Sequence, residues 1–164
     1  MRILLLIFIT LLFTSCGYQP SSKFARNVVG DKVSTSVIIS DRDPENSVII
    51  KDSIDSAIIE VFNASLVDRK SAKTHLELKI SNPSYLPIQY DKDGYIVAYQ
   101  TTTVLNIKKY FNGISKVYTT KGRYNFTIAP NAVITDQERF QAIKFSAIKA
   151  IESFVAKVSA EGSK

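Results

Sequence analysis

The stretch between residues 74 and 128 constrains the fold most, because it has the pattern of an antiparallel three-strand meander. Polar and apolar residues alternate from His75 to Ile80, so the first strand has one polar and one apolar face. Asp93-Gly94 and Asn112-Gly113 are turn dipeptides that suit tight hairpins. The segment between them is rich in β-branched and aromatic residues. The sequence therefore predicts a sheet with one buried face.

The same pattern predicts which meander side chains face the core. The first strand is interrupted at Asn82-Pro83 and meets a second proline at Pro87, which indicates a bulge or an edge position because proline donates no ladder hydrogen bond. On the second strand the odd positions are the more apolar and are expected under the helices: Tyr95, Val97, Tyr99, Leu105 and Ile107. The third strand alternates Tyr118, Tyr124, Phe126 and Ile128 against Thr119, Lys121, Arg123 and Asn125.

Two amphipathic helices are expected to cover the apolar face. Before the first of them, residues 33–40 form a short strand with 37–39 as its buried centre. Asp43 suits the N-cap of this helix and Pro44 its first turn. Its apolar stripe is Ile50, Ile54, Ala57, Ile58, Val61 and Phe62. The second helix starts with the capping-box pattern Thr135-Asp-Gln-Glu138. Its stripe is Phe140, Ile143, Ala147, Ile151, Phe154, Val155 and Val158.

The element order β-α-β-β-β-α predicts an α+β fold. Each helix has one apolar stripe and the sheet has one apolar face, so both helices should pack on that face. We expect a two-layer sandwich with a four-stranded, mostly antiparallel sheet.

The first fifteen residues have the features of a secretory signal peptide. Arg2 gives the positive start, and the apolar core from Ile3 to Phe13 is shorter than the roughly 20 residues that a membrane-spanning helix needs. Thr14-Ser15 and then Cys16, the only cysteine, follow this core and resemble a bacterial lipobox, with Phe13 where leucine is usual. A lipobox implies cleavage before Cys16 and attachment of a diacylglycerol and an acyl chain to it. The alternative is a secreted protein with an odd cysteine.

The rest of the chain has the length of one domain. Residues 16–31 lack a sustained period and are expected to form a tether, and residues 32–162 a single domain. Without Arg2 the chain has 20 basic and 15 acidic residues, a net charge of about +5. This charge suits the phosphates of anionic lipid, lipopolysaccharide or nucleic acid. Export argues against nucleic acid.

Catalysis has few candidate groups. His75 is the only histidine, so it can form neither a conventional zinc cluster nor a Ser-His-carboxylate triad. Ser146-Ala-Ile-Lys149 matches the Ser-x-x-Lys motif of penicillin-binding enzymes, but the partner motifs of that chemistry are missing from the sequence. We expect Ser146 and Lys149 on the exposed side of a helix, and a protein that is neither an enzyme nor dependent on a metal or cofactor.

Basic residues near the meander turns are the candidate ligand contacts. Lys92 lies in the turn from Asp91 to Gly94, where its ammonium could reach an anion. The alternative is a solvated charge on a hairpin. The weaker candidates, for which that alternative is favoured, are Lys108, Lys109, Lys116, Lys121 and Arg123.

The chain resembles the LptE family of lipopolysaccharide-assembly lipoproteins. The resemblance rests on the start Cys16-Gly-Tyr-Gln-Pro20, on a strand running into residues 40–45 and a helix, on the turn Tyr90-Asp-Lys-Asp-Gly94, and on the strand with Tyr99-Gln100 and Asn106. It implies a lipid-anchored protein on the periplasmic side of the outer membrane. Such a protein would plug the LptD-type export barrel, help it assemble, and contact lipopolysaccharide.

The resemblance also places Lys92 at the family's basic position before the turn glycine. The connection at residues 129–133 departs from the family by having no charge, which weakens a two-point phosphate clamp. Homo-oligomers are not expected. Two other functions stay open: an auxiliary lipoprotein of a lipid-transporting ABC system, and an adaptor lipoprotein that activates a periplasmic cell-wall enzyme.

Overall fold

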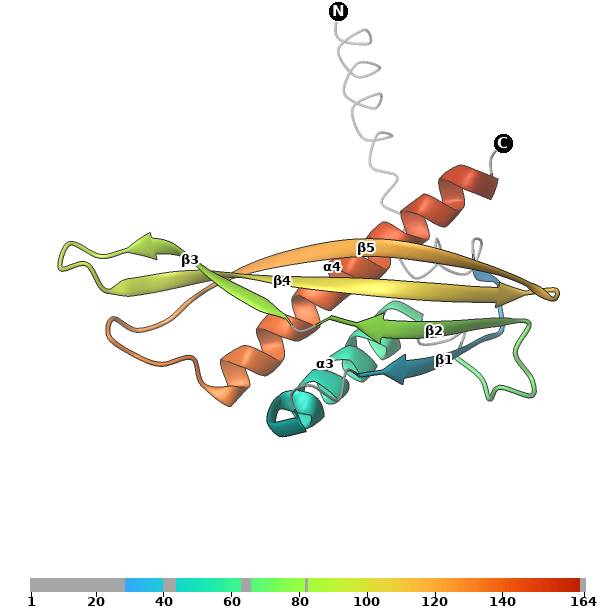
Figure 1. Ribbon diagram of the computed structural model, residues 1–164, viewed down its shortest axis with the longest axis horizontal. Coiled ribbons are helices and arrows are strands. Elements are labelled where there is room, and N and C mark those ends of the chain that lie inside the picture. The colour runs from blue at the N-terminus through green and yellow to red at the C-terminus, as the bar shows by residue number, and fades with distance from the viewer. Residues whose placement is uncertain (1–28, 40–43, 63–65, 82, 163–164) are drawn as a thin grey trace, which may run out of the picture.

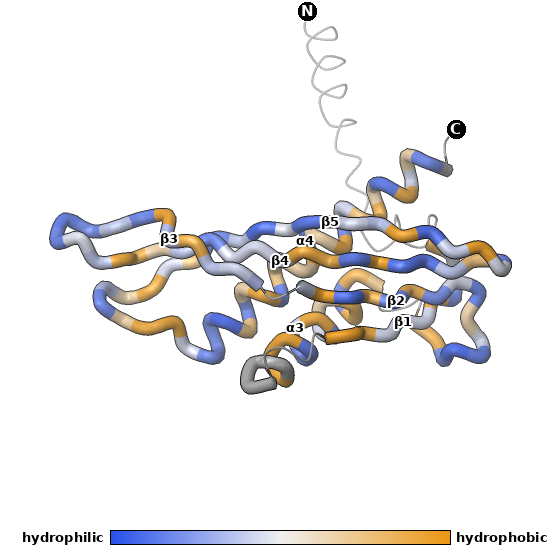
Figure 2. The backbone as a smooth tube through the Cα atoms, in the orientation of Figure 1, coloured by the Kyte–Doolittle hydropathy of each residue, from blue (hydrophilic) through white to orange (hydrophobic). Residues whose placement is uncertain are grey.

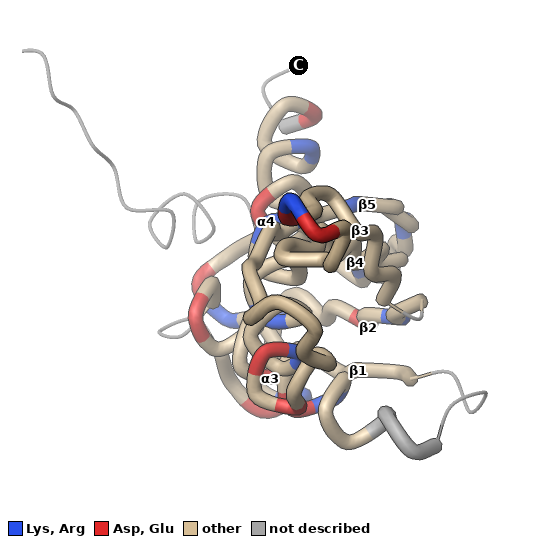
Figure 3. The backbone as a smooth tube through the Cα atoms, turned by 90° about the vertical axis from the view of Figure 1, so that its left-hand side faces the viewer, with Lys and Arg blue, Asp and Glu red and all other residues tan. Residues whose placement is uncertain are grey.

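The computed structural model describes residues 29–39, 44–62, 66–81 and 83–162. The elements, in chain order, are β1 (Val33–Ile38), α3 (Pro44–Phe62), β2 (Thr74–Ile80), β3 (Ser84–Tyr90), β4 (Ile96–Phe111), β5 (Ile114–Thr127) and α4 (Asp136–Gly162). Both helices lie on one side of a mostly antiparallel sheet (Figures 1 and 3). The predicted α+β class is therefore confirmed.

The long strand β4 is the centre of the sheet. β5 pairs with one side of β4, and β2 and β3 follow one another along its other side, β2 on the second half of β4 and β3 on the first half. β1 pairs in parallel with β2. The sheet thus has five strands and not the predicted four, because the strand predicted as interrupted is two separate strands. Pro83, which has no N–H for a ladder, lies just before β3.

One face of the sheet is covered by the helices, and we call the other the open face. Odd-numbered residues of β4 and even-numbered residues of β5 lie on the covered face, where Leu105, Ile107 and Tyr118 are buried. This confirms the alternation predicted for these strands, and Figure 2 shows the same alternation of hydropathy along β2. The prediction is wrong for Tyr95, which lies before β4 and is exposed.

The two predicted hairpin turns differ in form. Asn112 and Gly113 both have positive φ angles, 49° and 78°, and join the paired residues Phe111 and Ile114, so this is the tight two-residue hairpin that was predicted. The other turn is wider, because the last pair of β3 and β4 is Tyr90 with Ile96 and the ladder before it is bulged. The prediction of a tight turn at Asp93-Gly94 is therefore wrong.

The capping box at the start of α4 is confirmed. The Glu138 carboxylate accepts the Thr135 N–H at 2.8 Å, and the Glu138 N–H donates to the Thr135 hydroxyl at 3.2 Å. The N–H bond from Thr135 lowers the pKa of Glu138, so this contribution to stability is present above the usual carboxyl range and is lost as the pH falls through the lowered value. Asp43, the predicted cap of α3, lies outside the described residues.

The predicted helix stripes form the core. All six stripe residues of α3 are buried, and so are those of α4 apart from the partly exposed Phe140. The Phe154 ring meets the Tyr118 ring edge-on at 5.2 Å between centroids. Hydrophobic burial of these two stripes on one sheet face explains the two-layer arrangement.

α4 crosses the sheet at Gly122 of β5. A Cβ atom added to Gly122 would overlap the Ser146 carbonyl oxygen and would lie 2.6 Å from the Ala150 backbone nitrogen. Ser146 is fully buried there, and its hydroxyl is 2.6 Å from the Thr103 hydroxyl. The expectation that Ser146 lies on the exposed side of the helix is therefore wrong, whereas Lys149 is exposed. The Ser146 hydroxyl joins helix to sheet.

The folded domain begins earlier than predicted, because Val29, within the predicted tether, is part of the core. Val29 belongs to the hydrophobic core, and its carbonyl accepts a hydrogen bond of 2.7 Å from the Thr74 hydroxyl. In β1 the buried residues are Val33 and Ser34 at its start, whereas Ile38 is exposed. The prediction of a buried centre at 37–39 is therefore wrong for Ile38, whereas Val37 and Ile39 are partly buried and pack against the core. The fully buried part of β1 is its start, where Val33 pairs with Thr74.

β5 is an edge strand, since β4 is its one partner among the described strands. Part of this edge is occupied by α4, because the Lys157 ammonium donates to the Thr119 carbonyl oxygen at 2.7 Å.

Candidate functional site

The six predicted basic site residues do not form one site. β4 has 16 residues, and a strand of that length spans about 50 Å. The turn with Lys92 lies at one end of β4 and the Asn112-Gly113 turn at the other (Figure 1). Three groups result: Lys92 alone at the first end, Lys121 and Arg123 midway on the open face, and Lys108, Lys109 and Lys116 at the second end.

The turn that carries Lys92 is shaped by Asp91. One oxygen of the Asp91 carboxylate accepts the N–H groups of Asp93 and Tyr95, each at 2.9 Å, and Gly94 adopts a φ of 85°. This turn holds Lys92 exposed between two acidic residues. Figure 3 shows basic and acidic residues side by side near β3. A phosphate at Lys92 would therefore also meet a neighbouring negative charge.

The Lys92 turn lies at the tip of an arm, which we define as residues 84–98. β3 packs against β4 with little contact to either helix. The root of the arm is aromatic: the Tyr85 and Phe126 rings meet edge-on at 6.5 Å, and Phe126 stacks on Tyr99 at 6.0 Å. Burial raises the pKa of Tyr85 to about 12. The arm also exposes four large apolar side chains, Leu86, Ile88, Tyr90 and Tyr95. Such a surface suits a binding partner.

A hollow lies where the end of β5 meets the start of α4. Its lining residues are Tyr124, Asn125, Phe126, Thr127, Glu138 and Gln141. The one charged group among them is the Glu138 carboxylate. This hollow therefore offers no second cation for a phosphate clamp, in agreement with the uncharged connection at residues 129–133.

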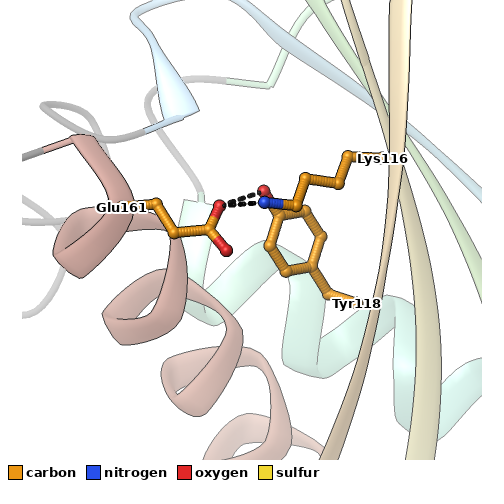
Figure 4. A network of polar contacts seen from close by, with 3 residues as sticks. All are labelled: Lys116, Tyr118 and Glu161. Carbon is orange, nitrogen blue, oxygen red and sulfur yellow. Dashed lines mark hydrogen bonds and ion pairs between the residues drawn. The ribbon is translucent and has the colours of Figure 1, made fainter. Parts of the chain in front are cut away.

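At the other end of the sheet, Lys116 belongs to a polar network with α4. Its ammonium donates to the Glu161 carboxylate at 2.7 Å, and the Tyr118 hydroxyl donates to the same oxygen at 2.8 Å (Figure 4). The bond from Lys116 lowers the pKa of Glu161, and burial is the main cause of the raised pKa of Tyr118. Lys109 lies on the same face and has no such bond, and burial lowers its pKa. With Phe111 and Ile114, these side chains line a second hollow.

The open face at this end carries a cation–aromatic cluster. The Lys108 ammonium lies 4.9 Å and the Arg69 guanidinium 6.0 Å from the Tyr110 ring centroid. His75 is on this polar face, as predicted, with its ring nitrogens 2.9 Å and 3.2 Å from the Ser34 and Ser36 hydroxyls. Burial lowers the pKa of His75. Within the described residues, no group of three or more His, Cys, Asp or Glu side chains could hold a metal ion.

The middle of the open face is polar. Gln100 donates to Asn125 at 3.0 Å, and Thr119 donates to Asn106 at 2.7 Å, in cross-strand pairs between β4 and β5. Lys121 and Arg123 stand exposed among them. No described helix covers this face, so it is free to meet a polar partner.

Sequence reasoning missed that the ends of the sheet differ. It grouped the basic residues by their nearness to turns, but only the strand pairing shows that β1 and the loop before β2 lie beside the Asn112-Gly113 turn. A signal was present for Gly122, because a glycine inside a strand often marks a close backbone approach. Cys16 lies outside the described residues, and no described helix is long and apolar enough to cross a membrane.

No protein-family model matches the chain, and no curated protein matches it. Among solved structures it is similar to rare lipoprotein B from Shewanella oneidensis, with a TM-score of 0.44, 14% identity, and coverage of 79% of this chain and 96% of that one. It is also similar to a minor lipoprotein from Acinetobacter baumannii, with a TM-score of 0.43, 10% identity, and coverage of 80% and 92%. For lipoprotein B from Nitrosomonas europaea the TM-score is 0.43, with 10% identity and coverage of 90% and 94%.

All three proteins are described as lipoproteins, and the chain is similar in structure to them. At these identities and TM-scores the similarity assigns neither a family nor a function.

Proposed function

We propose that this protein is a non-enzymatic, lipid-anchored protein on the periplasmic side of the outer membrane, which plugs and helps assemble an LptD-type lipopolysaccharide export barrel. The observation that carries the proposal is the long sheet with its open face. β4 and β5 pair over 14 residue pairs and present polar cross-strand pairs that no described helix covers. A broad polar surface of this kind suits the polar, water-filled interior of a large β-barrel.

The lipid anchor is proposed on Cys16 and the ligand contact on Lys92. Both follow from the sequence and from the resemblance to the LptE family. The exposed apolar side chains of the arm support a binding role for the same end of the molecule as Lys92, since they are available to a partner or to acyl chains.

Affinity purification of the tagged full chain from membranes, without crosslinking, tests the barrel partnership. We expect a large outer-membrane β-barrel protein to be recovered. Recovery of inner-membrane transporter subunits, or of a peptidoglycan synthase, would overturn the proposal in favour of a transport auxiliary or an enzyme-activating adaptor.

Charge changes at the arm tip test the ligand contact. We expect Lys92→Asp to weaken lipopolysaccharide binding in vitro by about two- to fivefold, because one exposed ion pair contributes about 0.2–1 kcal/mol. The matched variant Asp93→Asn should strengthen binding, because it removes the competing carboxylate that lies next to Lys92 in the turn. Barrel recovery should not change in either variant. If neither change alters the affinity, Lys92 is a solvated turn residue.

A further inference from the structure

We infer that the end of the sheet where the chain enters the domain is a docking surface for an anionic phospholipid bilayer. We call this the entry end, and it comprises residues 29–33, 66–74 and 108–116. The inference extends the proposed function, because it says which end of the anchored domain faces the bilayer. This orientation rests on the proposed anchor at Cys16.

Strand pairing brings the parts of the entry end together. Val33 pairs with Thr74, and Thr74 pairs with Phe111, so the start of β1 lies two strands from the β4–β5 turn. The Lys73 N–H donates to the Lys32 carbonyl at 3.0 Å, which places the loop before β2 at the same end. Twelve residues separate Cys16 from Val29. Such a segment reaches at most about 45 Å, so a lipid on Cys16 would tether this end of the domain to the bilayer.

The β4–β5 turn exposes apolar side chains at its tip. Ile114 is 73% exposed and Phe111 44%, and Val117 is 60% exposed on the other face of the same hairpin. A tight turn at the end of two long paired strands can project these groups into the boundary between headgroups and acyl chains. Lys109 and Lys116 flank them, with their ammonium groups 5.6 Å and 5.4 Å from the Phe111 and Tyr118 rings.

The excess of basic side chains at the entry end favours an anionic partner. The residues of the entry end include seven basic side chains, Lys32, Arg69, Lys70, Lys73, Lys108, Lys109 and Lys116, and two acidic ones, Asp31 and Asp68. Two further carboxylates lie next to it, Glu77 opposite Lys108 and Glu161 on α4, and basic side chains still outnumber acidic ones when both are counted. At the other end of the sheet, the arm and the start of α4 have the opposite balance. They carry Lys92 and Arg139 against Asp91, Asp93, Asp136 and Glu138. Apolar side chains surrounded by cations match a surface of anionic headgroups over acyl chains. The exposed apolar side chains of the arm are not surrounded by basic side chains in this way.

Vesicle flotation of the full mature chain carrying Cys16→Ser tests the inference without the lipid. We expect binding to phosphatidylcholine vesicles that contain phosphatidylglycerol, weaker binding to pure phosphatidylcholine, and a loss of binding as salt is raised. Phe111→Ser/Ile114→Ser should reduce binding at least about tenfold by removing the apolar contact. Lys70→Glu/Lys73→Glu, in an exposed loop, should reduce it at least about tenfold by reversing charge.

The matched control lies on the arm. Leu86 and Ile88 are 61% and 43% exposed, close to the values for Ile114 and Phe111, so Leu86→Ser/Ile88→Ser removes similar apolar surface from the other end. Vesicle binding of this variant should equal that of the parent. The inference is overturned if the unlipidated chain does not bind anionic vesicles, or if Leu86→Ser/Ile88→Ser loses as much vesicle binding as Phe111→Ser/Ile114→Ser. It is also overturned if Phe111→Ser/Ile114→Ser loses barrel recovery but keeps vesicle binding. Failure of the proposed function is detected separately, by the proteins recovered from membranes.

Discussion

Gly122→Ala is expected to lower the free energy of unfolding by about 3 kcal/mol. The added Cβ would overlap the Ser146 carbonyl oxygen and crowd the Ala150 nitrogen. Both are backbone atoms of α4, so no side-chain rotation relieves the overlap. The whole helix has to move off the sheet, and the buried hydrogen bond between Ser146 and Thr103 is then stretched. Urea unfolding followed by circular dichroism measures the change.

Gly94→Ala is the matched control for this prediction. Gly94 has a positive φ of 85° but open space around its missing Cβ. The same added methyl group should therefore cost only the backbone strain, about 1 kcal/mol. A Gly122→Ala variant that unfolds at the same urea concentration as Gly94→Ala would contradict the close approach of α4 to β5.

Cys16→Ser is expected to move the protein from the membrane fraction to the soluble periplasmic fraction. Each buried methylene of an acyl chain contributes about 0.8 kcal/mol, and several chains together anchor a protein firmly. Serine cannot form the thioether to diacylglycerol, so this whole contribution is lost. Contacts of the entry end with lipid should be too weak to retain the unlipidated chain at physiological salt.

The measurement needs cells depleted of the barrel partner, because a tight protein complex could also hold the chain at the membrane. Intact mass of the parent gives an independent reading. We expect a mature chain that begins at Cys16 and carries the mass of the attached lipids. A chain with an unmodified thiol would show that Cys16 is not an anchor, whatever the fractionation result.

Much of the fold was predicted correctly because turns, helix caps and amphipathic stripes depend on interactions between residues that are close in the sequence. The tight turn at Asn112-Gly113 needs two positive φ angles, which Asn and Gly tolerate best. The capping box is satisfied within four residues, from Thr135 to Glu138. Both helix stripes follow from spacing alone. In each case the residues that decide the structure are neighbours in the sequence.

What the sequence could not predict depends on distant parts of the chain. Ser146 looked like a residue of a polar helix face, but its hydroxyl meets Thr103 under the crossing at Gly122. In the sequence the basic residues share one feature, a position near a hairpin turn. In the structure Lys92 and Lys109 lie at opposite ends of β4. The candidate site was therefore predicted as a set of residue types, and the pairing of strands divides it into three separate groups.

The contact of Lys157 with β5 has a consequence for solubility. An open strand edge is a template on which another chain can add a strand, and long edges are the most hazardous in aggregation. With 14 residues, β5 is the longest described strand that has a free edge. A strand arriving at β5 would have to displace the Lys157 ammonium from the Thr119 carbonyl and pass beside Lys121 and Arg123. We therefore expect the Lys157 contact to hinder edge-to-edge association of β5 with other copies of the chain.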